Sequence, residues 1–381
     1  MTQVAIVADD LTGAIEAAAP FAERGLRTIV KWSTTATSGD ADVVALDTRT
    51  RGASPADARR ALTLVARTPL VAGAAVRFKK IDSTLRGHPA LEVATLAGAL
   101  GARRIVVTPA LPNQGRTVRG GAVYVQGEPL AQTAYARDIP ADDRGLSLIE
   151  ILHRSMPDAF VCGQAAPPWD IDWRPTVWVP DVATDGDLER IAASGDRERG
   201  ETFWAGSAGL AAALATVTGK TSPRRSAASV PDLIVVGTMS QATRAQVERL
   251  VALGGASPVT VRVASSEWRF AVARAPLNAP VVLLADPVPH SGALVSTTLA
   301  SAAAQALAAR GSACLLATGG STAAAVLESL GVEELEVVGR LDDGISQSRA
   351  MVHGRTVDFL SKPGGFGPKD ALLRLLDRPG Q

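Results

Sequence analysis

Two adjacent carboxylates, Asp9 and Asp10, follow an apolar run near the start of the chain, in the segment VADDLTGA at residues 7–14. We expect Val4–Ala8 to be a buried strand and a helix to begin close to Gly13. The carboxyl ends of parallel strands line the ligand crevice of an open sheet. One carboxylate can therefore orient a substrate hydroxyl while the other caps the helix, although capping alone would also explain the pair.

A second group of polar residues follows another apolar run, in RFKKIDSTLRGHP at residues 77–89. Lysine and arginine donate hydrogen bonds to carboxylates or phosphates, and arginine does so through a bidentate fork. We therefore expect this turn to bind an anionic substrate, and the alternative is a solvated turn that carries surface charges. The candidate residues are Lys80, Asp82, Ser83 and Arg86.

A third candidate region is TPALPNQGRTVRGGAVYVQGEPL at residues 108–130, where Arg116 stands among glycines and side-chain amides. Amides and guanidinium groups suit a polyol carboxylate, which offers both acceptors and donors. An ordinary loop explains this segment almost as well. We keep Arg116 as a candidate substrate ligand.

Three small-residue turns in the second half of the chain could present backbone N–H groups to a phosphate. They are VVGTMSQATRAQV at 235–247, LLATGGSTAAAVL at 315–327 and SKPGGFG at 361–367. The second is the strongest, because paired glycines lie between an apolar run and a predicted helix; the other two could be ordinary turns. The candidate phosphate-binding residues are Ser240, Thr318, Gly319, Gly320, Ser321, Thr322, Gly364 and Gly365.

The elements that must position these residues alternate between short apolar runs and alanine-rich helical segments. This alternation predicts an α/β fold, in which two domains each have a mostly parallel sheet flanked by helices. The polar segment Gly219–Ser229 is the expected linker, so we place the domains at residues 1–222 and 223–381. A ligand is expected in the cleft between them. The long segment Pro109–Asp143 is expected to contain a small hairpin at Ala122–Gln126.

Composition excludes several classes of function. The 381 residues have a formal net charge of +1, which gives no reason to expect a nucleic-acid or membrane partner. Neither an early signal peptide nor an uninterrupted apolar stretch of membrane-spanning length is visible, so we expect a cytoplasmic protein. The two cysteines and four histidines show no metal-ligand spacing, and no complete Walker A or dinucleotide motif occurs.

Taken in order, these motifs resemble those of the four-carbon acid sugar kinase family over nearly the whole chain. The first domain resembles the family's substrate domain through VADDLTGA, KKIDSTLRG and PALPNQGRTVRGGAVYVQGEPL, and the second resembles its nucleotide-binding domain through GTMSQATRAQ, ATGGSTAAAVL and KPGGFG. The resemblance implies phosphoryl transfer from ATP to 3-oxo-tetronate, threonate or erythronate, on the terminal hydroxyl. It places ATP contacts at Ser240, Gly319–Thr322 and Gly365. The chain is shorter than is usual for the family, in the middle of the first domain and near the linker.

For this reaction we expect Asp10, or failing that Asp82 or Asp9, to accept the hydroxyl proton. The substrate carboxylate would be held by Arg86 together with Lys80 or Arg116, and Mg²⁺ would bridge the ATP phosphates. No metal ligand is predicted. Two alternatives remain open: a kinase of another small aldonate, and a sensor that binds a sugar acid without turnover. A homodimer is a further hypothesis, for which the sequence gives no argument.

Overall fold

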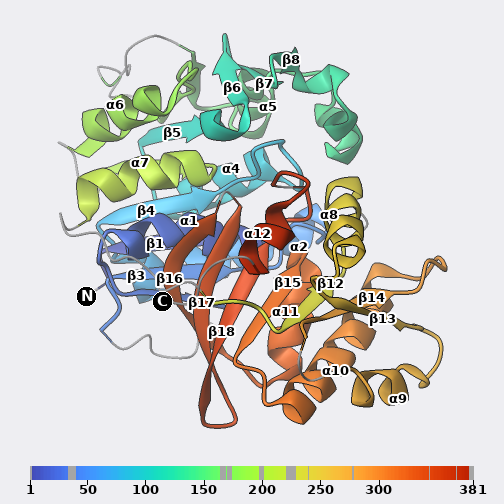
Figure 1. Cartoon of the computed structure of the whole chain (residues 1–381). Coiled ribbons are helices and arrows are strands. Elements are labelled where there is room, and N and C mark those ends of the chain that lie inside the picture. Colours follow the sequence, from blue (N-terminus) through green and yellow to red (C-terminus); the bar gives the residue numbers. More distant parts are fainter. Residues whose placement is uncertain are drawn as a thin grey trace. The chain divides into compact units, whose positions relative to one another are not determined.

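The computed structural model describes residues 2–32, 40–163, 169, 174–196, 201–219, 229–238, 240–276, 279–342, 344–365 and 367–376. The chain divides into two compact units, Met1–Pro223 and Arg224–Gln381 (Figure 1). The domain boundary expected after residue 222, and most of the expected linker Gly219–Ser229, lie outside the described residues. Each unit contains a largely parallel sheet flanked by helices, which confirms the predicted α/β class.

The first unit has a sheet whose described strands are all parallel, in the order β2-β3-β1-β4-β11-β5-β10-β9. Strands β1, β2 and β3 are buried along their whole length, as expected for a sheet covered on both faces. The strands are β1 (Val4–Ala8), β2 (Thr28–Lys31), β3 (Val43–Asp47), β4 (Val76–Lys80), β5 (Arg104–Thr108), β9 (Phe160–Cys162), β10 (Thr176–Trp178) and β11 (Thr202–Gly206).

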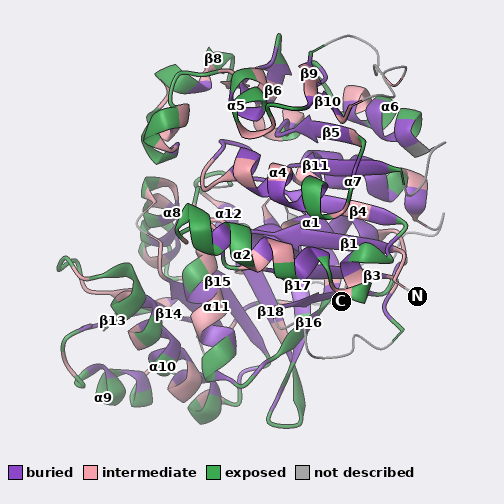
Figure 2. Cartoon of the chain, turned by 180° about the vertical axis from the view of Figure 1, so that it is seen from behind, coloured by how far each residue is buried: buried purple, intermediate pink, exposed green. Residues whose placement is uncertain are grey.

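Helices cover both faces of this sheet: α1 packs on α7 in one layer, and α2 packs on α4 in the other. Figure 2 shows the strands as buried, while the outer faces of α2 and α6 are exposed. In α2 the apolar residues Ala58, Leu62 and Val65 recur at helical spacing and are buried. The helices are α1 (Leu11–Glu23), α2 (Pro55–Ala66), α3 (Pro69–Ala72), α4 (Pro89–Ala99), α5 (Leu148–Ser155), α6 (Asp185–Asp196) and α7 (Ala208–Thr218).

The segment 109–143 folds into a small antiparallel sheet followed by short 3₁₀ turns. Its strands are β6 (Arg116–Arg119), β7 (Ala122–Val125) and β8 (Glu128–Pro129), paired in that order. The hairpin expected at Ala122–Gln126 is larger than predicted, because that segment supplies one strand, β7, of a three-stranded antiparallel sheet. The 3₁₀ turns are η1 (Pro112–Gln114), η2 (Leu130–Gln132), η3 (Ala134–Asp138) and η4 (Ala141–Asp143).

The second unit has strands in the order β13-β14-β12-β15-β18-β17-β16. The pairs from β13 to β18 are parallel, and β18, β17 and β16 are antiparallel to one another. The strands are β12 (Leu233–Val236), β13 (Ser257–Val261), β14 (Val281–Ala285), β15 (Cys314–Thr318), β16 (Glu334–Asp342), β17 (Ile345–Val352) and β18 (Arg355–Lys362). The sequence reasoning did not predict the antiparallel strands.

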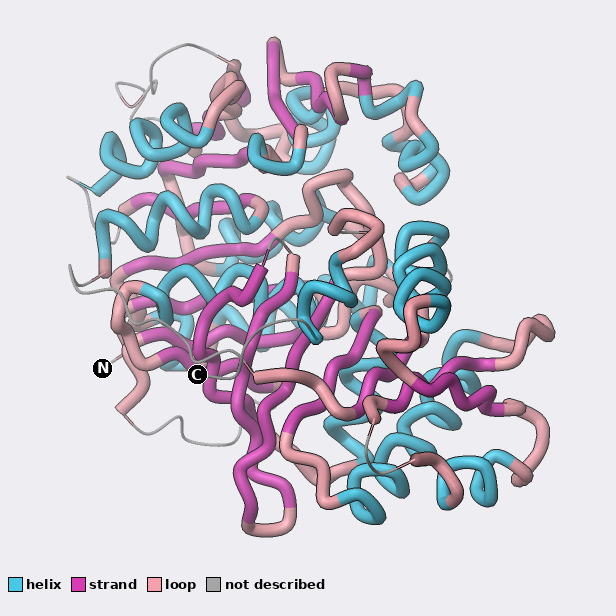
Figure 3. The backbone as a smooth tube through the Cα atoms, viewed as in Figure 1, coloured by secondary structure: helices cyan, strands magenta, loops and turns pink. Residues whose placement is uncertain are grey.

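A hydrophobic core lies between the sheet of the second unit and helices α8 and α12. There, Val247 and Leu250 of α8 and Leu372 of α12 pack on Leu316 of β15 and Leu360 of β18. Figure 3 shows these helices beside the run of strands. The helices are α8 (Gln241–Ala252), α9 (Trp268–Ala273), α10 (Gly292–Arg310), α11 (Gly320–Ser329) and α12 (Ala371–Leu376).

Helix α10 is long and apolar enough to cross a membrane when judged by length and composition alone. It nevertheless packs on α11, α9 and β14, and its buried side chains include Leu299 and Leu307. These contacts explain its apolar composition as that of a helix within the second unit.

Candidate active site

The first part of the candidate site lies in the short connection between β1 and α1. Asp10 has an extended backbone and caps α1, because its Oδ1 accepts a hydrogen bond of 2.8 Å from the backbone N–H of Gly13. A Cβ atom on Gly13 would lie 2.6 Å from that same oxygen. Asp9 is buried. The predicted pair of carboxylates is therefore present at the strand end, and Asp10 is the one that caps the helix.

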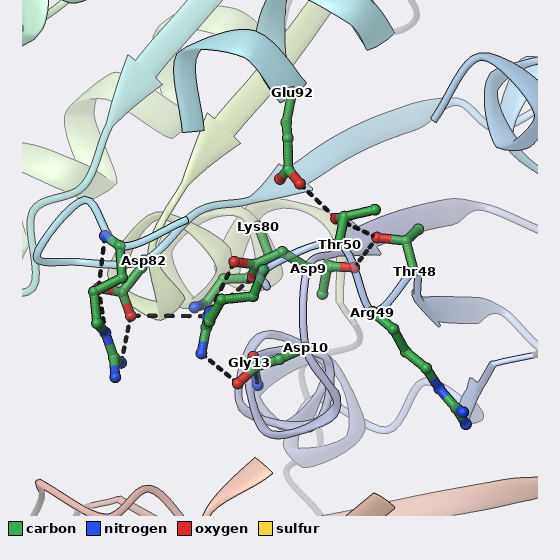
Figure 4. A network of polar contacts seen from close by, with 12 residues as sticks. Asp9, Asp10, Gly13, Thr48, Arg49, Thr50, Lys80, Asp82 and Glu92 are labelled. Atoms are coloured by element: carbon green, nitrogen blue, oxygen red, sulfur yellow. Dashed lines mark hydrogen bonds and ion pairs between the residues drawn. The ribbon is translucent and has the colours of Figure 1, made fainter. Parts of the chain in front are cut away.

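The guanidinium of Arg51 bonds to both carboxylates. Figure 4 shows Asp9 and Asp10 within this network of polar contacts. Its Nε donates to Oδ2 of Asp9 at 2.8 Å and one terminal nitrogen donates to Oδ1 of Asp9 at 2.9 Å, while the other pairs with Asp10. A third carboxylate, Asp82, lies 3.8 Å from the guanidinium. The sequence reasoning missed Arg51, which follows β3 in the segment TRTRG. The signal existed, because charged residues directly after a buried strand had marked the other two turns.

Asp82 begins the turn between β4 and α4. Its carboxylate accepts from the guanidinium of Arg86 at 3.1 and 2.7 Å, and from the hydroxyl and backbone N–H of Thr84 at 2.6 and 3.0 Å. The turn then passes through Gly87 in the left-handed region, with φ of 79°. A Cβ atom on Gly87 would lie 3.2 Å from Oδ2 of Asp9, so this glycine lets the turn approach the β1 end closely.

Two buried lysines at the end of β4 add positive charge. Lys79 forms an ion pair of 2.6 Å with Glu92 of α4, and Glu92 also accepts a hydrogen bond from Thr50. Lys80 lies on the other side of the strand, 3.7 Å from Glu16 of α1. Because side chains alternate along a strand, Lys79 ties β4 to α4 and Lys80 faces α1 and the two aspartates.

The carboxylates of this cluster differ in basicity. Burial raises the pKa of Asp10, and the neighbouring Asp9 adds to the effect, although Arg51 opposes it. For Asp9, burial also acts upward, but Arg51 and Lys79 outweigh it and hold its pKa below the usual range. For Asp82, burial is likewise outweighed, here by Arg86, so the pKa is well below the usual range. Asp10 is therefore the strongest base of the three predicted carboxylates.

Asp47, at the end of β3, is a carboxylate that the sequence reasoning did not select. Burial raises its pKa to about 7, against an opposing hydrogen bond of 2.9 Å from the backbone N–H of Arg49. Asp47 pairs in register with Ala8, the last residue of β1. A second titratable carboxyl therefore lies at the same edge of the sheet.

The remaining predicted substrate ligands have different positions. Ser83 is buried in the turn after Asp82. Arg116 lies on β6, where its guanidinium donates to the carbonyl of Gln114 at 2.5 Å and lies over the ring of Tyr135. The cluster described above, around Asp9, Asp10, Arg51 and Asp82, does not include Arg116.

The second unit brings three of the predicted turns together around Thr238, at the carboxyl ends of β12, β15 and β18. The hydroxyl of Thr238 accepts from the backbone N–H of Ser240 at 3.2 Å. A Cβ atom on Gly364 would lie 2.2 Å from the Thr238 hydroxyl, and one on Gly319 would lie 3.6 Å from its Cβ. The predicted phosphate-binding turns are thus neighbours in space, since their strands are neighbours in the sheet.

The turn between β15 and α11 resembles a phosphate-binding turn in its backbone. Gly319 has φ of 90° and precedes α11 without a side-chain cap, so the first N–H groups of the helix, at Gly320, Ser321 and Thr322, have no partner within the helix. The N–H of Gly319 itself donates to the carbonyl of Lys362 at 3.1 Å. The predicted contact between ATP and the N–H of Gly319 would have to compete with this hydrogen bond. The hydroxyl of Thr318 is buried.

Small residues let the adjoining turns pack closely. Thr322 is buried, and its hydroxyl lies 3.3 Å from that of Ser296 on α10. A Cβ atom on Gly237 would lie 1.7 Å from the Thr322 hydroxyl, so only glycine fits there. Around Gly365 there is open space on the side where a Cβ would point.

Comparison with known proteins assigns a role to each unit. Residues 4–157 match the model of a sugar-binding N-terminal domain, and residues 233–372 match that of a nucleotide-binding C-terminal domain. The chain is 30% identical to a D-threonate kinase of Bordetella bronchiseptica, covering 97% of this chain and 96% of that protein. It is 27% identical to a 3-oxo-tetronate kinase of Burkholderia multivorans, with the same coverage.

A solved structure from Salmonella typhimurium LT2 has the same fold, with a TM-score of 0.79, 22% identity and full coverage of both chains. The two matched domains, the coverage of nearly the whole chain by kinases and the clusters at the sheet edges agree with one another. The chain belongs to the four-carbon acid sugar kinase family and is an ATP-dependent kinase.

Proposed function

We propose that this kinase transfers the γ-phosphoryl group of ATP to the terminal hydroxyl of a four-carbon sugar acid such as 3-oxo-tetronate, threonate or erythronate. Relatives with the names D-threonate kinase and 3-oxo-tetronate kinase are similarly related to the chain, at 30% and 27% identity. They support the class of substrate and leave the isomer open.

The observation that carries the proposal is the cluster of carboxylates and cations at the end of β1. Asp10 is partly exposed and its pKa is raised, so it can accept a proton more readily than Asp9 or Asp82. In the proposed step the substrate hydroxyl oxygen bonds to the γ-phosphorus, and the bond from that phosphorus to the bridging oxygen breaks. ADP leaves, and the hydroxyl proton passes to Asp10.

Arg86 is the best placed group to bind the substrate carboxylate. Its side chain is 39% exposed although it pairs with Asp82, so it retains donors that face solvent. Arg51 is also partly exposed and has a fixed orientation, because Asp9 holds it through two hydrogen bonds. Lys80 adds positive charge beside Asp10. A small acid bearing one negative charge and several hydroxyls suits this combination.

ATP would lie in the second unit, with its phosphates on the N–H groups that begin α11, and with Ser240 and Gly365 at the adjoining turns. The described residues contain no group of three or more histidine, cysteine or acidic side chains that could hold a metal ion. In kinases Mg²⁺ keeps several waters and is bound by substrate phosphates together with one or two carboxylates, so Mg²⁺ that arrives with ATP does not require a cluster of three protein ligands. When bound, Mg²⁺ would neutralise charge on the transferred phosphoryl group.

ADP release should be measured with purified protein and Mg²⁺-ATP, across threonates, erythronates, 3-oxo-tetronate and longer aldonates. We expect turnover on one four-carbon acid. Asp10→Asn should reduce kcat by about 10²-fold or more and leave ATP affinity nearly unchanged, since its amide cannot accept the proton.

Turnover only on longer aldonates would refute the four-carbon assignment. Binding of an acid without ADP release would favour a sensor, and full activity of the Asn variant would exclude Asp10 as the base.

The cytoplasmic location, the homodimer and the cleft between the domains stay predictions. The two small-molecule partners of the proposed reaction are the sugar acid and ATP.

A further inference from the structure

Lys362, the last residue of β18, is a buried cation with neutral neighbours. Its side chain is 1% exposed, and its ammonium donates to the hydroxyl of Thr243 at 3.1 Å and to the carbonyl of Pro363 at 3.2 Å. No carboxylate among the described residues pairs with it, and burial is the sole cause that lowers its pKa, to about 8. A buried ammonium with only neutral acceptors is incompletely compensated, because it has lost water without gaining a counter-charge.

The sheet register places Lys362 next to a residue whose buried hydroxyl is unpartnered among the described residues, Thr318. Leu316 of β15 and Leu360 of β18 face α8, and side chains alternate along a strand, so Thr318 and Lys362 face α8 as well. These two residues pair in register at the carboxyl ends of their strands. The Thr318 hydroxyl is buried and has no hydrogen-bond partner among the described residues. Two buried polar groups with unused donors therefore lie beneath the first turns of α8.

Lys362 also contacts each of the three turns that would hold ATP. Its carbonyl accepts from the N–H of Gly319, before α11. Its ammonium donates to Thr243, in the first turn of α8, whose hydroxyl in turn donates to the carbonyl of Gly364 at 2.7 Å. A polyphosphate that lies on these turns would be close to the only buried charge that they contain among the described residues.

We propose that Lys362 is the counter-charge for the β- and γ-phosphates of the bound nucleotide. The proposal rests on the proposed function, because it assumes that the second unit binds ATP at these turns. The phosphates supply the negative charge that the protein itself does not provide, so binding of the nucleotide and protonation of Lys362 favour each other.

Calorimetric titration of AMP, ADP and ATP into the full-length protein and into Lys362→Met tests this assignment. Removal of one partner from a close charge pair costs about 2 kcal/mol or more, so we expect ADP and ATP affinity to fall about 30-fold, and AMP affinity to fall much less. Methionine preserves the length of the side chain, and thermal unfolding of the variant shows whether it is folded.

Thr243→Val is the matched control, because it removes the link from Lys362 to Gly364 but keeps the charge. We expect this substitution to lower the affinities for AMP, ADP and ATP by similar small factors. Proton uptake gives a second readout that a structural role would not change. Burial lowers the pKa of Lys362 to about 8, so ADP binding to the natural protein at pH 8 should take up protons, and binding to Lys362→Met should take up fewer.

Equal losses for AMP, ADP and ATP in Lys362→Met would overturn the proposal, as would unchanged ADP affinity in a folded variant. Failure of the natural protein to bind any adenine nucleotide would overturn both this proposal and the ATP part of the proposed function. The selective loss of ADP and ATP affinity would support the role of Lys362 even if no four-carbon acid were phosphorylated.

Discussion

Replacement of Arg51 by methionine should destabilise the first unit, because it leaves Asp9 and Asp10 without their shared counter-charge. Breaking a buried ion pair by removing one partner costs about 3–5 kcal/mol. The Arg51 side chain is 23% exposed and that of Asp10 is 19% exposed, so some of the charge remains solvated. We therefore expect the free energy of unfolding to fall by about 3 kcal/mol at pH 7.

The loss should depend on pH in a defined direction. Arg51 lowers the pKa of Asp9 in the folded protein. The stability that this ion pair contributes is therefore present above the unfolded pKa of 3.8 and is lost as the pH falls through the folded pKa. Without Arg51, burial would raise the pKa of Asp9 and Asp10, and both would take up protons as the pH falls. The difference between Arg51→Met and the natural protein should therefore shrink between pH 7 and pH 4.5.

Urea unfolding of the full chain, followed by tryptophan fluorescence, measures this effect mainly in the first unit. Five of the six tryptophans precede residue 223, namely Trp32, Trp169, Trp173, Trp178 and Trp204. Arg60→Met is the matched control, because Arg60 pairs with Asp57 at 3.0 Å on the surface of α2 with side chains 72% and 57% exposed. Its loss should be below about 1 kcal/mol. A similar loss in both variants, or a loss for Arg51→Met that is equal at pH 4.5 and pH 7, would refute the reasoning.

Two further substitutions test the site. In Gly13→Ala the new Cβ would lie 2.6 Å from Oδ1 of Asp10 and would displace this carboxylate, so kcat should fall. The free energy of unfolding should change little, because the gain in helix propensity and the loss of the cap are each worth about 1 kcal/mol and oppose one another. Gly98→Ala, with open space around its Cβ in α4, should gain stability and retain kcat; equal kcat in both variants would contradict the prediction. Asp47→Asn should be more stable than the natural protein at pH 8 and similar at pH 4. Because the pKa of Asp47 is raised in the folded protein, its protonated carboxyl contributes stability below pH 3.8 that is lost as the pH rises through about 7. An equal difference in urea midpoint between Asp47→Asn and the natural protein at pH 4 and pH 8 would contradict this.

Local sequence patterns predicted most of the elements that build the two sheets. Apolar runs marked β1, β3, β12 and β15, because strands buried on both faces are continuously hydrophobic. The antiparallel strands β16, β17 and β18 were missed. In β17 the consecutive residues Ser346, Gln347 and Ser348 are all buried, so neither a continuous nor an alternating apolar pattern can be read there.

By itself the sequence indicated several of the residues that could do chemistry, since a polar group directly after an apolar run is expected at a strand end. The tertiary structure alone decided which of these residues meet. Parallel strands are joined through helices, so strand order does not follow chain order, and β1 lies between β3 and β4. That order brings Arg51 from the end of β3 and Asp82 from the end of β4 to the two aspartates of β1, and it sets Lys362 beside Thr318. The raised pKa of Asp10 and the lowered pKa of Asp82 follow from those neighbours and from burial, which no local pattern encodes.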